Sequence, residues 1–151
     1  MDIQIDDPAG PDVTGLLAEH LADMYATSPA ESVHALDVGA LKVPGVTFWT
    51  VRIDGTLLGC GALKELAADH AEVKSMRTAT SARGAGVATA LLLHLVEEAR
   101  RRGYARLSLE TGSQDFFAPA RRLYRRYGFT ECGPFADYVL DPNSVFLTRE
   151  L

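Results

Sequence analysis

Hydrophobic residues change their spacing several times along this chain, and each change marks an expected element. Alternation over residues 3–5 predicts a short strand, and apolar residues at helical spacing follow Pro11. Two longer strand-like runs, 47–53 and 57–63, are separated by Asp54-Gly55, which is a strong hairpin signal. The first part of the chain is therefore expected to form a strand, helical structure and an antiparallel hairpin.

The second half alternates strands with helices. Residues 70–78 are the next expected strand, and the amphipathic helix that follows ends before Gly103. The strand over 106–111 comes after this helical crossover, so it should pair in parallel with 70–78. A further helix and two short strands complete the chain. We predict one mixed α/β domain over residues 1–151, with a central, mostly antiparallel sheet that contains one parallel pair and is flanked by helices.

A glycine-rich turn precedes the first of these two helices, with the sequence Arg83-Gly84-Ala85-Gly86-Val87-Ala88. Its glycines let the backbone approach a ligand, and the helix N-terminus offers unpaired N–H groups and positive potential to an anion. A dinucleotide fingerprint would need a third small residue where Thr89 stands, and the Gly-Lys-Ser/Thr of a P-loop is absent. The hexapeptide alone is compatible with a plain strand-to-helix turn, but it also suits a pyrophosphate.

Three motifs occur in a recognisable order: residues 71–78, then Arg83-x-x-Gly86-x-Ala88, then Ala120-x-x-Leu123-Tyr124-x-x-Tyr127-Gly128-Phe129. Together they closely resemble the GNAT superfamily of acyl-CoA-dependent N-acetyltransferases, over most of the chain from Thr47 onward. The resemblance implies a GNAT-like fold. It also implies transfer of an acetyl group from acetyl-CoA to a primary amine, by direct attack in a ternary complex and without a metal ion.

The resemblance also assigns residues to the cosubstrate. The expected contacts to acetyl-CoA come from the strand before the turn, the turn itself and the second helix: Met76, Arg77, Thr78, Arg83, Gly84, Ala85, Gly86, Val87, Ala88, Thr89, Phe117 and Tyr124. Phe117 stands where many family members carry an asparagine that contacts the pantetheine arm. Another acyl-CoA donor therefore stays open, and so does a module that senses acyl-CoA without catalysis.

Acetyl transfer needs a base, because an amine nucleophile is mostly protonated at neutral pH. The resemblance places Glu72 in this role, acting through ordered water. The alternative for Glu72 is an ordinary strand carboxylate or a partner of Lys74 or Arg77. Glu65 and Glu110 are weaker candidates for the base.

Two further roles follow from motif position. The backbone amide of Met76 is expected to stabilise the oxyanion that develops on the thioester carbonyl. Tyr124 is expected to protonate the departing thiolate, with Tyr127 and Tyr138 in reserve. Each of these residues also has a packing interpretation, since a methionine on a strand and a tyrosine at helical spacing are ordinary core residues.

The composition limits the classes of binding partner that can be expected. The formal net charge of −5 argues against nucleic acid and anionic membranes as partners. Cys60 and Cys132 are isolated, the histidines lack metal-ligand spacing, and the first residues do not resemble a signal peptide. We expect a cytoplasmic protein without a metal. The acceptor, a small-molecule amine or a protein amine, is not specified by the sequence, and a homodimer stays open.

Overall fold

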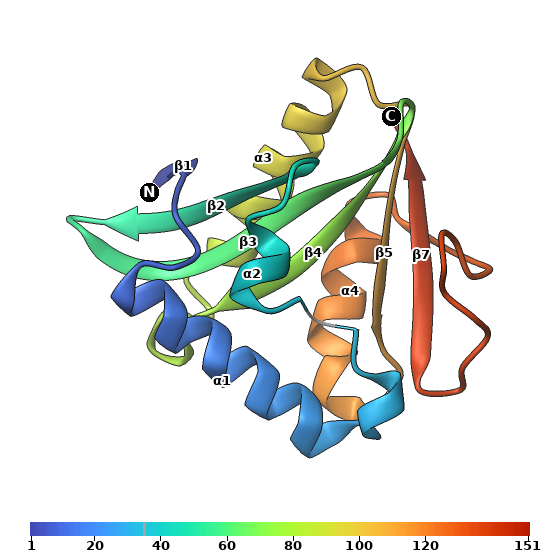
Figure 1. Cartoon of the computed structure of the whole chain (residues 1–151), viewed down its shortest axis with the longest axis horizontal. Helices are drawn as coiled ribbons and strands as arrows, with labels where there is room; N and C mark the ends of the chain where they lie inside the picture. Colours follow the sequence, from blue (N-terminus) through green and yellow to red (C-terminus); the bar gives the residue numbers. More distant parts are fainter. Residues whose placement is uncertain (35) are drawn as a thin grey trace.

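The computed structural model describes residues 1–34 and 36–151, and a seven-stranded sheet forms its centre (Figure 1). The strand order is β1-β2-β3-β4-β5-β7-β6, and among the strands of the described residues only β4 and β5 pair in parallel. The strands are β1 (Asp2–Ile5), β2 (Val46–Ile53), β3 (Thr56–Ala67), β4 (His70–Thr78), β5 (Arg106–Gly112), β6 (Thr130–Cys132) and β7 (Ser144–Glu150). The expected mixed sheet with one parallel pair is thus confirmed.

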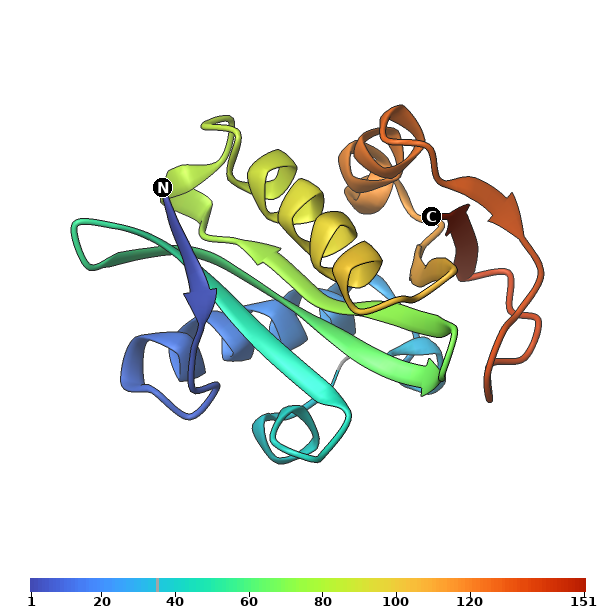
Figure 2. The ribbon, with the colours of Figure 1, turned by 90° about the horizontal axis from the view of Figure 1, so that it is seen from above.

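Helices cover both faces of the sheet, as the view from above shows (Figure 2). The helix α1 (Pro11–Thr27) and the short α2 (Val38–Leu41) lie on one face, and α3 (Val87–Arg101) and α4 (Ala118–Arg126) lie on the other. Single 3-10 turns occur at Ala30–Ser32, Thr80–Ala82 and Asp115–Phe117. Within the described residues, no helix combines the length and the apolar character that crossing a membrane requires.

Each face has its own hydrophobic cluster. On the α1 side, Val13 and Leu17 of the helix pack with Phe48 and Cys60 of the sheet. The cluster on the α3 side is larger, and it extends from Trp49 on β2 across to β7. The amphipathic spacing of α3 produces this packing, because its buried residues Val87, Leu91, Leu92, Leu95, Val96 and Ala99 all face the sheet.

The hairpin signal in the sequence is also confirmed. β2 and β3 pair antiparallel, and Asp54 and Gly55 between them have φ values of 50° and 81°. Two left-handed residues in succession suit a tight hairpin turn, because the twist of such a turn matches that of the strands. The Asp-Gly pair therefore sets the register of the hairpin that supports β4.

Two glycines of β3 bring α3 close to the sheet. A Cβ atom at Gly59 would lie 2.9 Å from Val87 Cγ1 and 2.9 Å from the carbonyl oxygen of Arg77. A Cβ at Gly61 would lie 2.8 Å from Met76 Sδ. All three distances are shorter than non-bonded contacts in packed interiors. The start of α3 can approach β3 and β4 only because these two positions carry no side chain.

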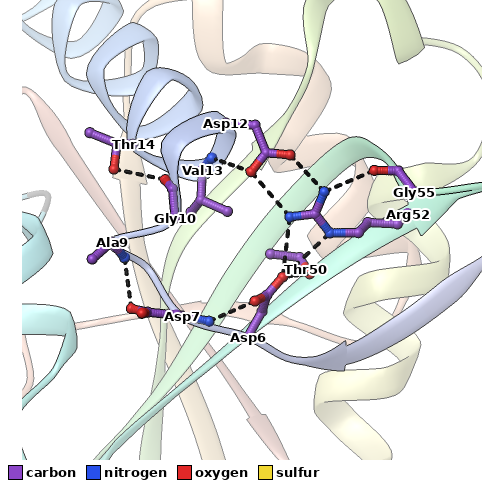
Figure 3. Close-up of polar contacts among 10 residues, drawn as sticks. All are labelled: Asp6, Asp7, Ala9, Gly10, Asp12, Val13, Thr14, Thr50, Arg52 and Gly55. Atoms are coloured by element: carbon purple, nitrogen blue, oxygen red, sulfur yellow. Dashed lines mark hydrogen bonds and ion pairs between the residues drawn. The ribbon is translucent and has the colours of Figure 1, made fainter.

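An ion-pair network fixes the chain between β1 and α1 to the sheet (Figure 3). The Arg52 guanidinium on β2 donates to Asp6 and to Asp12, with Nη1 lying 2.6 Å from Asp12 Oδ2. Thr50 donates a further hydrogen bond to Asp6, 2.8 Å long. Hydrogen bonds from Arg52 lower the pKa of Asp12 below its ordinary value of 3.8. The network therefore anchors the start of α1 over the sheet.

Candidate active site

A cavity of about 570 Å³ opens where β4 and β5 separate. The two strands pair only at His70–Arg106, Ala71–Leu107 and Glu72–Ser108, and they diverge beyond Glu72. Side chains from α1, β4, the glycine-rich turn, β5 and α4 line the space between them. The cavity thus lies at the carboxyl ends of the two parallel strands, where open α/β sheets bind their ligands.

The glycine-rich turn forms one end of this cavity. Gly84 and Gly86 both have φ of 80°, a conformation that glycine adopts without strain. A Cβ at either glycine would meet no protein atom within 4 Å, so both face open space. Arg83 also lines the cavity. The turn is therefore open toward the cavity, as the approach of a ligand to the backbone requires.

The first turn of α3 offers free amides beside these glycines. Ala90 N–H bonds back to the carbonyl of Gly86, and no side chain among the residues that the structure describes caps the helix N-terminus. The N–H groups of Val87, Ala88 and Thr89 precede this bond, and all three residues line the cavity. These amides and the positive end of the helix dipole suit the phosphates of a nucleotide.

The opposite wall comes from β5 and α4. Tyr124 is 6% exposed and lines the cavity, and burial raises the pKa of its phenol. Within the described part of the chain, no protein group forms a hydrogen bond with its hydroxyl. Phe117 packs closely against Gly112, where a Cβ would approach its ring to 2.1 Å. The wall is thus largely apolar, with one phenol that stays protonated at neutral pH.

A bulge distorts β4 at the middle of the cavity. The register with β3 passes from Cys60–Arg77 to Ala62–Lys74, so Ser75 and Met76 together lie opposite Gly61. Ser75 has φ of 55°, which is rare for a residue with a side chain. The bulge and the divergence from β5 occur on the same few residues. Backbone groups of this segment are therefore directed differently from those of a regular ladder.

Glu72 lies next to the cavity but does not line it. Its side chain is 3% exposed, accepts a 2.5 Å hydrogen bond from the Tyr138 hydroxyl and lies 3.5 Å from Lys74 Nζ. Lys74 also donates to the carbonyl oxygen of His34, at 2.9 Å, and to the Tyr138 hydroxyl, at 2.8 Å. The pairing of Glu72 with Lys74, which the sequence left open, is present. The carboxylate is enclosed by these partners.

Glu110 lines the cavity on the facing strand. It lies on β5, two residues beyond the last pair with β4, and is only partly exposed. Burial raises its pKa to about 7, and the positive charge of Lys74 opposes this rise. A carboxyl group with this pKa exchanges a proton near neutral pH, as a general base must.

The α1 side of the cavity is polar. Asp23 forms a 2.5 Å ion pair with Nη1 of Arg77, and His20 and Met24 lie beside them along the helix. Burial and the positive charge of Arg77 lower the pKa of His20 to about 4, so its imidazole is neutral at pH 7. This wall lies on the face of the sheet opposite to α3 (Figure 2).

Most of the residues predicted from the sequence meet in this cavity. Ala85 and Glu72 do not line it, and neither do the reserve tyrosines Tyr127 and Tyr138. Glu65 accepts a hydrogen bond from Tyr104 outside it. Within residues 1–34 and 36–151, no group of histidine, cysteine, aspartate or glutamate side chains is arranged to hold a metal ion.

The sequence did not single out several residues of this cavity. His20, Asp23, Met24 and His34 come from the N-terminal region, where the resemblance is weakest. The left-handed conformation of Ser75 has no sequence signal, because serine favours other conformations. Glu110 was named from the sequence as a weaker candidate for the base, but its position at the opening depends on where β4 and β5 separate.

The mixed sheet of the described chain, with its single parallel pair and flanking helices, is the fold of acyltransferases. Comparisons with known proteins give the family. Residues 14–129 match the acetyltransferase (GNAT) family. The sequence is also 54% identical, over 100% of both chains, to a Bacillus subtilis protein described as an uncharacterized N-acetyltransferase, YsnE. The chain therefore belongs to the acetyltransferase (GNAT) family.

Solved structures show the same fold. A Klebsiella pneumoniae structure assigned to the acyl-CoA N-acyltransferases has a TM-score of 0.82 and 27% identity, over 99% of this chain and 97% of that chain. A GNAT family acetyltransferase from Elizabethkingia anophelis, with acetyl-CoA bound, has a TM-score of 0.71 and 18% identity, again over 99% and 97%. Enzymes of this family use acetyl-CoA.

Proposed function

We propose that this enzyme transfers an acetyl group from acetyl-CoA to a primary amine, by direct attack in a ternary complex. One observation carries the proposal. A single cavity joins the glycine turn, which suits a pyrophosphate, to Tyr124 and Glu110 at the opening between β4 and β5. An anion site, a proton donor and a proton acceptor are the groups that this reaction requires.

The cosubstrate is assigned to the turn side of the cavity. Gly84, Gly86 and the amides of Val87–Thr89 would hold the pyrophosphate, with Arg83 adding a positive charge. Backbone groups from Met76 to Thr78 would hold the pantetheine arm as it enters the opening. Phe117 contributes apolar packing in place of an asparagine. The open space in front of both glycines supports this assignment.

Groups on both strands and on α4 take part in the proposed reaction. The ammonium group of the acceptor loses one proton to Glu110, and the free amine attacks the thioester carbonyl carbon. A nitrogen–carbon bond forms, the carbon–sulfur bond breaks, and the nitrogen releases a second proton. The thiolate takes its proton from Tyr124, which is then reprotonated, so one proton is released overall. The Met76 amide would stabilise the developing oxyanion.

Glu110 is proposed as the base in place of Glu72. Glu110 lines the cavity and has a pKa of about 7, so it is available and accepts a proton at neutral pH. Glu72 is enclosed by Tyr138 and Lys74, and its side chain is 3% exposed. We assign Glu72 the role of holding Lys74 and the Tyr138 hydroxyl in place.

A binding and turnover experiment tests the proposal. Calorimetric titration of the purified protein with acetyl-CoA should give saturable binding, with NADH as a control that does not bind. Amines are then screened for CoA release with a thiol reagent. Release that depends on an amine supports the transferase. Absence of acetyl-CoA binding would remove the proposal, and binding without release for any amine would favour a sensing module.

A further inference from the structure

Lys74 lines the cavity, but the reaction proposed above gives it no role. Its side chain is 9% exposed, and oxygen atoms surround its ammonium group. Nζ donates to the carbonyl oxygen of His34 at 2.9 Å and to the Tyr138 hydroxyl at 2.8 Å. The carboxylate oxygen Oε2 of Glu72 lies 3.5 Å away. A buried charge is costly unless partners compensate it, so a buried lysine beside a reaction cavity requires an explanation.

The contacts of Lys74 come from segments far apart in the sequence. His34 precedes α2, and Tyr138 belongs to the connection between β6 and β7. A lysine ammonium on its flexible stem can take many positions, and these two hydrogen bonds hold it in one. The positive charge of Lys74 is therefore fixed at the wall of the cavity.

Lys74 and Glu110 occupy corresponding positions on the two strands that diverge. The last parallel pair is Glu72–Ser108, and Lys74 and Glu110 each lie two residues beyond it. Side chains alternate along a strand, so residues two apart point to the same face of the sheet. Both residues also line the cavity. The ammonium and carboxyl groups therefore lie across the opening from one another, on the same face of the sheet.

The groups around Glu110 act on its proton in opposite directions. Burial raises its pKa to about 7. Ser144 of β7 and the positive charge of Lys74 oppose this rise, and the negative charges of Glu72 and Asp141 add to it. Lys74 is the cation among these groups. Its charge thus favours the ionised form of a carboxyl group that burial would otherwise keep protonated.

The other titratable groups of the cavity do not duplicate this effect. Within the described chain, those that line it are His20, Asp23, His34, Arg77, Arg83 and Tyr124. Asp23 and Arg77 form an ion pair with each other. Both imidazoles are neutral near pH 7, because burial lowers their pKa values, and burial keeps the phenol protonated. Arg83 lies in the glycine turn, at the end of the cavity assigned to the pyrophosphate.

We propose that Lys74 is a positioning residue for acetyl transfer, whose ammonium group, held across the opening from Glu110, keeps that carboxyl group ionised to receive the proton of the acceptor. A buried carboxyl group that retained its own proton could not act as a base, and a base works best when its pKa lies near the working pH. This inference rests on the proposed acetyl transfer with Glu110 as its base. It adds the residues that hold the lysine, Tyr138 and His34.

A pH profile of Lys74→Met tests the inference. The substitution keeps an unbranched side chain and removes the charge. The rise of activity with pH should move upward by about one pH unit or more, and kcat/KM at pH 7 should fall about tenfold. Activity should return at about pH 9, whereas a damaged fold would lose activity at every pH. Lys74→Arg restores the charge and should move the rise back toward the parental pH.

Direct titration of Glu110 gives a second measurement that does not depend on turnover. The side-chain carboxyl carbons are followed by carbon NMR in the whole protein, and Glu110→Gln identifies the resonance of this residue. Its pKa should rise in Lys74→Met together with the activity limb. Lys64→Met is the matched control, because it removes a positive charge from the neighbouring strand β3, outside the cavity. It should leave both measurements unchanged.

A double variant keeps the test valid if Lys74→Met does not fold. Lys74→Met combined with Glu72→Gln replaces the buried ion pair by neutral side chains of similar size, a change that proteins often tolerate. Glu110 then loses the effects of both charges, and the effect of Lys74 is the larger one. The activity limb should therefore still move upward, but by less than in the single variant.

The outcomes separate this inference from the proposed function. An upward shift of both the Glu110 pKa and the activity limb in Lys74→Met supports it. An unchanged pKa of Glu110 would overturn the inference and leave acetyl transfer intact. A raised pKa with an unmoved limb would overturn it as well, because Glu110 would then not be the base. Failure of acetyl-CoA to bind would instead remove the proposed function itself, and this inference with it.

Discussion

Glu72 of β4 lies opposite Ser108 of β5 in the last parallel pair of the sheet, and the two strands diverge beyond it. The point where the strands diverge lies between the carboxylates of Glu72 and Glu110. Glu72 is enclosed within the paired region, and Glu110, two residues past Ser108, lies at the opening. The two groups should therefore respond differently to the same substitution.

Replacing Glu110 by glutamine should remove the base. We expect kcat to fall by about 10²- to 10⁴-fold, the range of general-base contributions. In the parent, Glu110 is protonated below its pKa of about 7, so activity should rise with pH and level off above 7. A pH profile of Glu110→Gln should lack this limb. Retention of the limb would assign it to another group.

Replacing Glu72 by glutamine should affect stability more than chemistry. The variant leaves the buried Lys74 ammonium, which is 9% exposed, without its charged partner. Breaking such a pair typically costs about 3–5 kcal/mol. Urea unfolding should show this loss, and the activity limb near pH 7 should persist in the folded fraction. A stable Glu72→Gln protein without that limb would return the role of base to Glu72.

Replacing Tyr124 by phenylalanine should slow acetyl transfer without weakening acetyl-CoA binding. The change removes only the hydroxyl of a residue that lines the cavity, and this hydroxyl forms no hydrogen bond with the described part of the chain. We expect kcat to fall about 10²-fold, because the thiolate then leaves unprotonated. Tyr127→Phe, at the C-cap of the same helix, is the control and should be nearly silent. Parental turnover in Tyr124→Phe would exclude the phenol as the acid.

Replacing Gly86 by valine should abolish acetyl-CoA binding. Gly86 has φ of 80°, which a β-branched residue adopts only with strain, and its side chain would project into the cavity. Calorimetric titration measures the loss. Gly133→Val is the matched control, because Gly133 has no positive φ and also faces open space. Tight binding by Gly86→Val would contradict the pyrophosphate assignment.

Replacing Arg52 by methionine should destabilise the fold by about 1–2 kcal/mol, or a Tm decrease of about 2–8 °C. Hydrogen bonds from Arg52 lower the pKa of Asp12, and for Asp6 the Thr50, backbone and Arg52 contacts outweigh the opposing effect of burial. Carboxylates with lowered pKa stabilise the fold above their ordinary value of 3.8 and lose this effect as pH falls below it.

The parent and Arg52→Met should therefore differ in unfolding free energy at pH 6 and converge below about pH 3.8. Thermal unfolding across this range, at low salt, measures the difference. A gap that does not depend on pH would show that the loss comes from packing of the arginine stem.

The sequence predicted those parts of the fold that have local signals. Asp54-Gly55 predicted the hairpin, and the helical connection through α3 favoured the parallel pair, because parallel neighbours need a crossover connection, which is usually a helix. The glycine turn before α3 could also be predicted, because glycine adopts positive φ without strain. These features depend on a few neighbouring residues.

The rest depends on contacts between distant segments. The enclosure of Glu72 requires Tyr138, 66 positions later, and the orientation of Arg77 requires Asp23, 54 positions earlier. No local pattern records such partners. The choice between Glu72 and Glu110 as base therefore depends on where two strands diverge, which the alternation of either strand does not specify.

Gly59 lies outside the cavity, yet the proposed cosubstrate site depends on it. It does not line the cavity, yet it leaves room for Val87 at the start of α3. The mutational tolerance of the enzyme should reflect this. In a library selected for acetylation, substitutions at position 59 should be depleted about as strongly as those at position 86. Shrinking Val87 should rescue them only in part, because the Arg77 carbonyl occupies the same space.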